Sequence, residues 1–391
     1  MSTAARSTLA AFALLALSTA AAAFETEAQA AYVIDHNTRQ VMLSHNDQLP
    51  LPPASMSKLM TLNMVFEALE DGRLEMETLL PVSTHAMSFG GSTMFLTTRD
   101  RVSVEDLIRG VVVLSGNDAS VVLAEALSPD GTEAGFADMM TQRALQLGME
   151  NSTFRNASGW PAPGHVMSMR DLGILAERLI TEFPQYYPYF AETEFLFDGR
   201  APDNRFNRNP ILTMGIGADG LKTGHTQEAG YGLVGSAMQG DRRVTFVITG
   251  IDTPGKRARE AERIVNWAFR QFAEREVLAA GTILAEAEVF MGAAESVGLT
   301  PAENVTMLIP AIQGNVIEAE VVYEGPIVAP IKEGAVLGTL VVRLEGFDER
   351  RIPLVAVAPV ERGGIVARLG TAVRLILHDL LGGVVPAAVP G

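Results

Sequence analysis

The chain has 391 residues, 48% of them hydrophobic and 19% charged, which is typical of a globular protein with a sizeable core and room for two or three domains. A formal net charge of −16 disfavours nucleic-acid binding, because that function normally requires a basic face. Cysteine is absent, which excludes disulfides, thiolate metal sites and a cysteine nucleophile.

The first 23 residues contain the three parts of an export signal. Arg6 supplies a positive charge, residues 9–17 form an apolar run, and Ala21-Ala22-Ala23 provide a small-residue cleavage site. The apolar run is too short for a membrane-spanning helix, which needs about 20 residues. The sequence therefore predicts that residues 1–23 are a signal peptide and that the mature chain is exported.

Residues 24–277 show strand patterns at both ends and helical patterns between them. Two strands are expected within residues 31–44, around a polar turn at 36–39. Apolar residues at helical spacing then predict helices at 55–69, 104–114, 119–127 and 169–180. Further strands are expected at 231–234 and 244–248, and a last helix at 258–272. This order predicts an α+β domain, an antiparallel sheet with a helical insertion.

The pattern changes after residue 277. Apolar and acidic residues alternate over residues 317–324, as in a strand with one solvated face. Similar short runs at 305–309, 335–344 and 352–357 are separated by Gly and Pro, which predicts a small all-β domain over residues 278–360. In the final segment, 361–391, residues 364–382 show the periodicity of an amphipathic helix.

The first chemical motif is Ser55-Met56-Ser57-Lys58, at the start of a predicted helix. Positions i and i+3 share one helix face, so the Lys58 amine is expected one turn from the Ser55 hydroxyl. A serine becomes a strong nucleophile when a neighbouring base removes its proton, and a lysine can do so if its pKa is lowered. The motif alone is weak evidence, since many helices begin with a serine and carry a solvated lysine.

Two further motifs follow in the order that a serine acyltransferase needs. Ser115-Gly116-Asn117 falls in a predicted break between two helices, and Lys222-Thr223-Gly224 begins the later strand region. Lys222 is expected to keep Lys58 neutral by like-charge repulsion, and the Thr223 hydroxyl to bind an anionic group. Gly224 is expected to let a substrate backbone approach closely. The coincidence of order, spacing and context makes the three motifs together a strong signal.

These motifs resemble those of low-molecular-mass penicillin-binding proteins, specifically serine-type D-alanyl-D-alanine carboxypeptidases. The resemblance also covers residues 91–96, 207–209, 259–262 and 331–340, and so spans nearly the whole mature chain. It implies a penicillin-binding/β-lactamase-like serine transpeptidase fold for residues 24–277, followed by the all-β domain and the C-terminal helix.

The resemblance implies a catalytic role for each residue of the first two motifs. Ser55 would attack the carbonyl carbon of the D-Ala-D-Ala bond, with Lys58 as its general base. Ser115 would pass the proton to the leaving amine. Asn117 would hydrogen-bond Lys58 and the substrate amide. Water would then hydrolyse the acyl-enzyme.

The resemblance also implies a substrate-binding set. Lys222 would keep the site electropositive, and Thr223, within Lys222-Thr223-Gly224, would bind the terminal carboxylate. The backbone N–H groups of Ser55 and His225 would form the oxyanion hole, worth about 3–4 kcal/mol per donor. Arg208 and Arg259 are candidate anion clamps. Many relatives carry Cys or Asn where this chain has Gly232, a difference that we attribute to packing.

The implied partners are a peptidoglycan stem peptide ending in D-Ala-D-Ala, β-lactam antibiotics as inhibitors, and a membrane surface contacted by the C-terminal helix. The expected location is the periplasmic face of the inner membrane, with peripheral attachment. No cofactor, metal or nucleic acid is expected.

Three other functions remain open at this point. A class A β-lactamase shares the motifs, but no E-x-x-L-N stretch lies between Ser115 and Lys222, and such an enzyme would lack the extra β domain. A DD-endopeptidase acting on cross-links would carry the same motifs. A catalytically weak cell-wall binding module is the alternative from a different class. The G-x-G-x-x-G match at residues 215–220 leads into an extended segment, which argues against nucleotide binding.

Overall fold

The computed structural model describes residues 24–311, 317–344, 347 and 349–364. The chain forms two compact units, and the boundary between them falls after Phe272. The expected signal peptide and, from residue 365 on, the expected C-terminal helix lie outside the described residues. Within the described part of the chain, no helix has the length and apolar character needed to cross a membrane.

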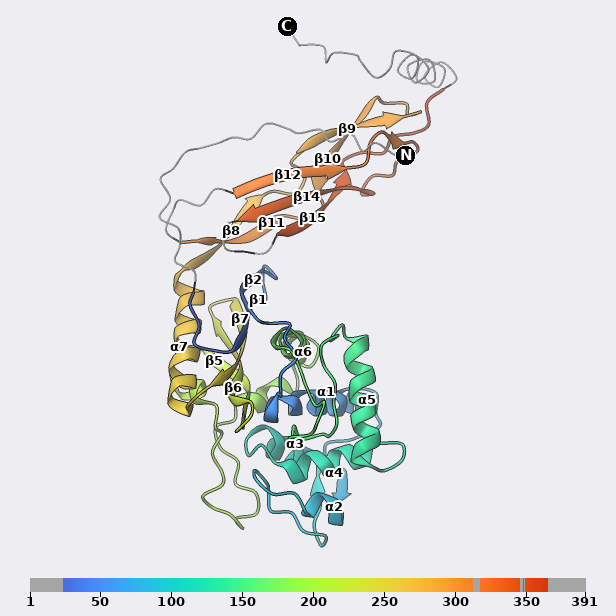
Figure 1. The fold of residues 1–391 in the computed structure, drawn as a ribbon. Coiled ribbons are helices and arrows are strands. Elements are labelled where there is room, and N and C mark those ends of the chain that lie inside the picture. Colours follow the sequence, from blue (N-terminus) through green and yellow to red (C-terminus); the bar gives the residue numbers. More distant parts are fainter. Residues whose placement is uncertain (1–23, 312–316, 345–346, 348, 365–391) are drawn as a thin grey trace. The chain divides into compact units, whose positions relative to one another are not determined.

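Both ends of the first unit contribute to one antiparallel sheet, as the sequence predicts (Figure 1). Its strand order is β2-β1-β7-β6-β5, and β1 pairs with β7 in a register that places Tyr32 opposite Val247. β5 is an edge strand of this sheet. The strand bounds are β1 Ala30–Asp35, β2 Val41–His45, β5 Ala218–Thr226, β6 Gly230–Gln239 and β7 Arg242–Ile251.

Most helices of the first unit lie between β2 and β5 in the chain, and α7 (Pro254–Arg270) follows β7. Side-chain caps from Ser103, Thr132 and Ser168 begin α3, α5 and α6 by accepting a backbone N–H three residues later. The remaining elements of the first unit are η1 Ala54–Ser57, α1 Lys58–Glu70, β3 Leu79–Pro81, α2 Thr84–Met87, β4 Arg101–Ser103, α3 Val104–Val112, α4 Asn117–Leu127, α5 Glu133–Gln146, α6 Met169–Thr181, η2 Tyr187–Ala191 and η3 Pro210–Thr213.

The helices predicted within residues 24–277 are present, with two differences. Helix α5 was not predicted, although its buried Phe136, Met140 and Ala144 recur at four-residue spacing. The helix expected over residues 55–69 begins with the 3-10 turn η1, so Ser55 precedes the regular α-helix.

Helix α1 is buried on almost every side instead of along one stripe, and even its polar residues Lys58, Thr61 and Asn63 are buried. Burial of polar groups requires hydrogen-bond partners. Thr61 Oγ1 donates to the Ala157 carbonyl at 2.6 Å, and Asn63 Oδ1 accepts from Arg178 Nε at 2.9 Å. These satisfied contacts anchor the helix that carries Lys58.

A buried ion pair fixes the end of β1 against β7. Arg242 Nε lies 2.6 Å from Asp35 Oδ2, and the two side chains are 10% and 0% exposed. The other oxygen of Asp35 accepts from the Thr38 backbone N–H and hydroxyl. Removal of one partner would leave the other charge buried without compensation.

The second unit is all-β, as predicted. Its larger sheet has the order β12-β14-β15-β10-β9-β13, and a separate two-stranded sheet pairs β11 with β8. The expected domain boundary at 277/278 differs from the observed one because β8 pairs with β11. The bounds are β8 Phe272–Leu278, β9 Ala285–Phe290, β10 Ser296–Pro301, β11 Val305–Pro310, β12 Ile317–Tyr323, β13 Ile327–Val328, β14 Val336–Leu344 and β15 Arg350–Ala356.

The core of the second unit is formed by inward-facing aliphatic residues such as Leu299, Leu354 and Ala356. In β12, Val321 and Tyr323 pack against this core whereas Val322 is 49% exposed, consistent with the predicted alternation.

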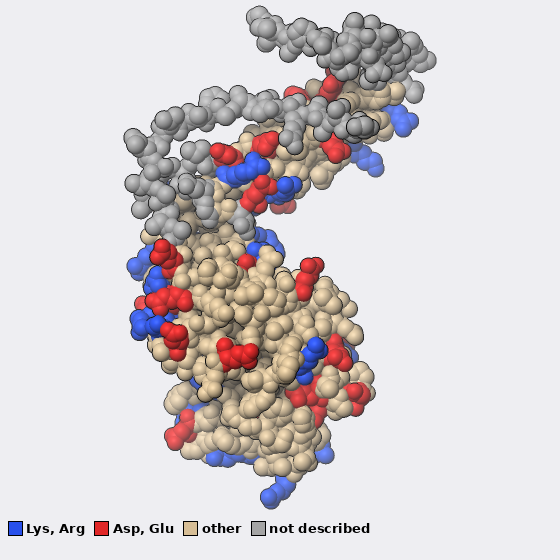
Figure 2. Space-filling model, viewed as in Figure 1, with Lys and Arg blue, Asp and Glu red and all other residues tan. Residues whose placement is uncertain are grey.

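On the face of the first unit shown in Figure 2, acidic and basic side chains are interspersed over α7.

Candidate active site

The structure brings Ser55 and Lys58 together as predicted. Lys58 Nζ lies 3.0 Å from Ser55 Oγ, because η1 and the first turn of α1 place the two residues on one face. Lys58 is completely buried, and Ser55 is partly exposed. The hydroxyl is therefore accessible to a ligand while the amine behind it is shielded from water.

Two further oxygens surround the Lys58 amine. Lys58 Nζ donates to Asn117 Oδ1 at 2.7 Å and to the Ser158 carbonyl at 2.5 Å. Both are acceptors only, so they take the two protons of a neutral amine. The nitrogen lone pair then remains for the Ser55 hydroxyl, which can donate. Asn117 was predicted as a partner, whereas Ser158 was not.

Burial, and after it the positive charge of Arg208, lower the pKa of Lys58 to about 7. Removal from water is the main cause and Arg208 is the main charge, while the repulsion expected between Lys58 and Lys222 lowers the pKa of Lys222. For Lys222 itself, burial and the charges of Lys58, Arg208 and Arg257 hold the pKa well below its usual range. A lysine that is neutral near pH 7 is suited to act as a general base.

Ser115 lies between α3 and α4, and Asn117 is the first residue of α4, at the predicted break. Ser115 is 3% exposed and has a left-handed backbone with φ 59°. The Asn117 backbone N–H donates to the Ser92 carbonyl at 2.7 Å, and its Nδ2 donates to the Gly90 carbonyl at 2.8 Å. The segment around residues 90–92 therefore holds Asn117 in position for Lys58.

Strand β5 contributes Lys222 and Thr223, which are 2% and 8% exposed. Gly224, on the same strand, packs closely against the turn before α1. A Cβ at this position would lie 2.9 Å from the Pro53 carbonyl oxygen and 3.0 Å from Met56 Cγ. The glycine therefore lets β5 approach the turn that carries Ser55.

The next residues of the same sheet also lie beside this turn. The exposed His225 stacks on Tyr231, with ring centroids 3.9 Å apart. A Cβ at Gly232 would lie 2.7 Å from Met56 Cε. Met56 thus occupies the space that a side chain at Gly232 would need, consistent with the attribution of this difference to packing.

The two predicted anion clamps have different surroundings. Arg208 donates to Ser92 Oγ at 2.8 Å and to the Leu114 carbonyl, next to Ser115, and no described residue forms an ion pair with it. Arg259 is exposed on α7, and no hydrogen bond joins it to these groups. The structure therefore does not place Arg259 in the cluster.

Arg257, two residues earlier on α7, lies in the cluster instead. It is only 6% exposed, and its Nη2 donates to the Arg208 carbonyl at 3.2 Å. Its buried Nε has no hydrogen-bond partner among the described residues. Two residues along a helix are about 200° apart, so Arg257 and Arg259 point to opposite sides. The helical spacing of Arg257 relative to the buried residues of α7 is the sequence signal that could have distinguished the two arginines.

A second feature missed from sequence is the turn after Asn156. Asn156 Oδ1 accepts backbone N–H bonds from Gly159 at 2.8 Å and Trp160 at 3.1 Å, and this turn presents the Ser158 carbonyl to Lys58. Gly159 has φ 75°, and a Cβ there would lie 1.9 Å from the Ala54 carbonyl oxygen. Only glycine fits this contact beside the nucleophile.

The site thus contains an accessible hydroxyl, a buried amine beside it, the amine of Lys222, and the guanidinium groups of Arg208 and Arg257. Such a set can transfer an acyl group from a substrate that carries a carboxylate near the reacting carbonyl. No group of three or more His, Cys, Asp or Glu residues arranged to hold a metal ion is present in the described part of the chain.

Family models match both units of the chain. The model described as D-alanyl-D-alanine carboxypeptidase matches residues 17–253, and the model described as penicillin-binding protein 5, C-terminal domain, matches residues 272–362. The D-alanyl-D-alanine carboxypeptidase DacC of Escherichia coli is 34% identical over 365 residues, covering 91% of this chain and 90% of the relative.

Solved structures give the same result. Penicillin-binding protein 5 from Haemophilus influenzae has a TM-score of 0.73 and 31% identity, covering 86% of this chain and 98% of that one. Penicillin-binding protein D2 from Listeria monocytogenes, in the ampicillin-bound form, has a TM-score of 0.56 and 31% identity, covering 62% of this chain and 97% of that one. With its two matched regions and these relatives, the chain belongs to the D-alanyl-D-alanine carboxypeptidase family.

Proposed function

We propose that this protein removes the terminal D-Ala from peptidoglycan stem peptides ending in D-Ala-D-Ala, through an acyl ester on Ser55. The observation that carries the proposal is the surroundings of Lys58. Its amine lies 3.0 Å from Ser55 Oγ, and both other neighbours are hydrogen-bond acceptors. This arrangement favours transfer of the serine proton to the lysine.

In the acylation step, Ser55 Oγ bonds to the carbonyl carbon of the penultimate D-Ala while its proton moves to Lys58 Nζ. The backbone N–H groups of Ser55 and His225 stabilise the resulting oxyanion. The C–N bond then breaks, and the proton passes by way of Ser115 to the nitrogen of the departing D-Ala. In the second step a water oxygen attacks the ester, Lys58 takes the water proton, and Ser55 Oγ leaves with a proton.

The substrate carboxylate is bound by Lys222, the Thr223 hydroxyl and the guanidinium of Arg257, with Arg208 beside them. The support for Arg257 is its buried Nε, which lacks a partner in the described part of the chain. A buried donor without a partner costs free energy, and an anionic ligand would satisfy it. In this proposal Arg257, and not the candidate Arg259, binds the carboxylate.

The same chemistry explains inhibition by β-lactams, since the strained lactam carbonyl would acylate Ser55 and the drug carboxylate would bind the same cations. No described carboxylate hydrogen-bonds to Ser55 or Lys58, so an acyl-enzyme lacks the extra glutamate that class A β-lactamases use to activate water. Slow nitrocefin turnover with a long-lived adduct would support the carboxypeptidase, and rapid turnover would reject it in favour of the β-lactamase.

The decisive experiment is intact-protein mass spectrometry after incubation with penicillin, with and without a competing pentapeptide, beside an assay of D-Ala release. The wild type should gain one penicilloyl group, the pentapeptide should reduce it, and Ser55→Ala should lose both labelling and release. Labelling that survives in S55A would refute the nucleophile. Penicillin labelling without D-Ala release would favour a binding module, and release only from cross-linked dimers would favour an endopeptidase.

The domain roles complete the proposal. The unit that ends at Phe272 would carry the enzyme and the β-rich unit that follows would be the second domain, after a removed signal peptide over 1–23. An amphipathic helix within residues 361–391 would hold the enzyme peripherally at the periplasmic face of the inner membrane. Deletion of residues 363–391 should release the protein from membranes without change in activity on soluble peptide. An unaltered membrane fraction would reject the anchor.

A further inference from the structure

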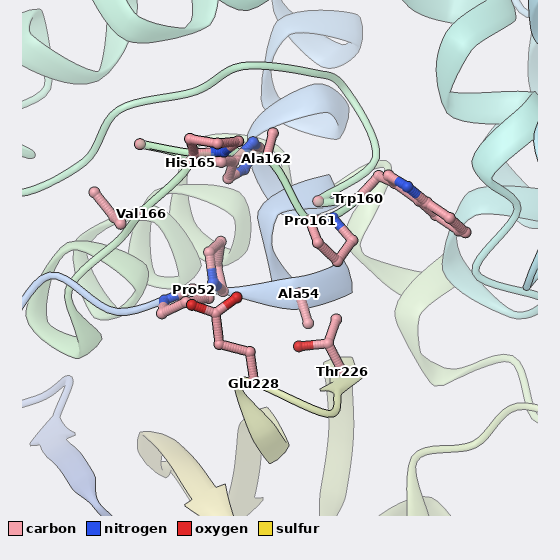
Figure 3. Close-up of a pocket in the computed structure, with 13 residues that line it drawn as sticks. Pro52, Ala54, Trp160, Pro161, Ala162, His165, Val166, Thr226 and Glu228 are labelled. Atoms are coloured by element: carbon pink, nitrogen blue, oxygen red, sulfur yellow. The ribbon is translucent and has the colours of Figure 1, made fainter.

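A pocket of about 430 Å³ opens beside the turn that carries Ser55. Its walls come from Pro52 to Ala54 on one side and from the chain around Pro161 and His165 on the other. Glu228, in the turn after β5, closes a third side and extends toward Pro52 (Figure 3). The volume is in the range of about 300–1,000 Å³ that is common for small-molecule sites.

The pocket has apolar walls and one charged group. His165 contributes no charge, because burial lowers its pKa to about 4, and its ring nitrogens contact Ser57 Oγ and the Arg155 backbone N–H. Among the described residues that line the pocket, Glu228 is the one carboxylate, and no lysine or arginine is present. Glu228 is exposed and forms no ion pair with any described residue. A ligand group complementary to these apolar walls and this carboxylate is an aliphatic chain that ends in an ammonium group.

The position of the pocket along β5 identifies which part of a substrate reaches it. Under the proposed function, the substrate carboxylate lies at Lys222 and Thr223, and the scissile carbonyl lies near Ser55 and His225. From Thr223 to Thr226, the last residue of β5, a strand advances about 10 Å. In an extended peptide the third residue from the C-terminus lies about 7–10 Å from the terminal carboxylate. This residue therefore lies at the level of Thr226 and the pocket.

We propose that this pocket binds the side chain of the residue preceding D-Ala-D-Ala, and that Glu228 selects a side chain with a terminal ammonium group. The proposal rests on the proposed function, because it takes the carboxylate end of the substrate to lie at Thr223. It adds a specificity-determining residue outside the three motifs. The wall opposite Glu228 contains proline and glycine residues, and neither residue type has a long side chain that could fill the pocket.

The test compares two peptides that differ in one charge: Nα-acetyl-L-Lys-D-Ala-D-Ala with a free ε-ammonium, and the same peptide acetylated at Nε. The wild type should release D-Ala from the free-amine peptide with the higher kcat/KM. Glu228→Gln should lower that kcat/KM about two- to fivefold, the range expected for an exposed ion pair, and leave the acetylated peptide unchanged. Raising the salt concentration should reduce the preference of the wild type.

Two variants make the test specific. Glu228→Lys should reverse the preference, because it places a like charge in the pocket. Glu262→Gln removes an exposed carboxylate on α7 and should behave as the wild type. Equal kcat/KM for the two peptides in the wild type, or an equal loss for both in E228Q, would overturn the pocket assignment while leaving the carboxypeptidase intact. Absence of D-Ala release from either peptide would overturn the proposed function and this inference with it.

Discussion

Replacement of Gly159 by alanine tests whether the turn after Asn156 positions the nucleophile. The new Cβ would lie 1.9 Å from the Ala54 carbonyl oxygen, whereas contacts below 3.0 Å essentially do not occur. The two segments must therefore separate by about 1 Å, and Ala54 is bonded directly to Ser55. A displacement of about 1 Å at a reacting group can reduce the rate about 100-fold.

The stability cost of G159A has two parts. An alanine at φ 75° costs about 1–2 kcal/mol, and the steric overlap adds about 1–3 kcal/mol. Gly148→Ala is the matched control, since Gly148 has φ 80° and no atom within 4 Å of the added Cβ. It should lose only the first part of the free energy of unfolding and should acylate as fast as the wild type.

The measurements are the rate of acylation by a fluorescent penicillin and the free energy of unfolding by urea. We expect G159A to unfold more easily than G148A and, while folded, to acylate about 100-fold more slowly than it. Equal acylation rates for the two folded variants would refute the reasoning, because they would show that the position of Ser55 does not depend on this contact.

Two other predictions concern the Lys58 pKa and the Asp35–Arg242 pair. The acylation rate should rise about tenfold per pH unit below pH 7 and level off above it, because only neutral Lys58 accepts the serine proton. Arg208→Gln should move the midpoint of this profile to higher pH, since the positive charge of Arg208 lowers the Lys58 pKa. A rate that is constant from pH 5.5 to 8.5 would reject Lys58 as the base. Asp35→Ala should cost about 3–5 kcal/mol of unfolding free energy, since Arg242 stays buried without its partner. Asp71→Ala, at an exposed pair, should change little in the same urea titration, and equal losses would contradict the argument.

Local periodicity predicted the fold well where an element's own residues decide it. The strands at 31–44 and 231–248 and the helix at 169–180 are present, because alternation and helical spacing follow from the geometry of each element. Helix α5 was missed although its buried residues have four-residue spacing. The boundary between the units lies before the expected one because β8 pairs with β11, and strand pairing is not visible in the local pattern.

The sequence by itself determined the order of the motifs and the contact between Ser55 and Lys58, since a separation of three residues in a helical turn brings the two side chains together. Only the tertiary structure decided what makes Lys58 a base. The Ser158 carbonyl lies 100 positions along the chain from Lys58, and the burial that lowers the lysine pKa comes from segments packed around α1. The choice of Arg257 over Arg259 and the charge of Glu228 in the pocket likewise depend on contacts between distant segments, which a linear pattern does not contain.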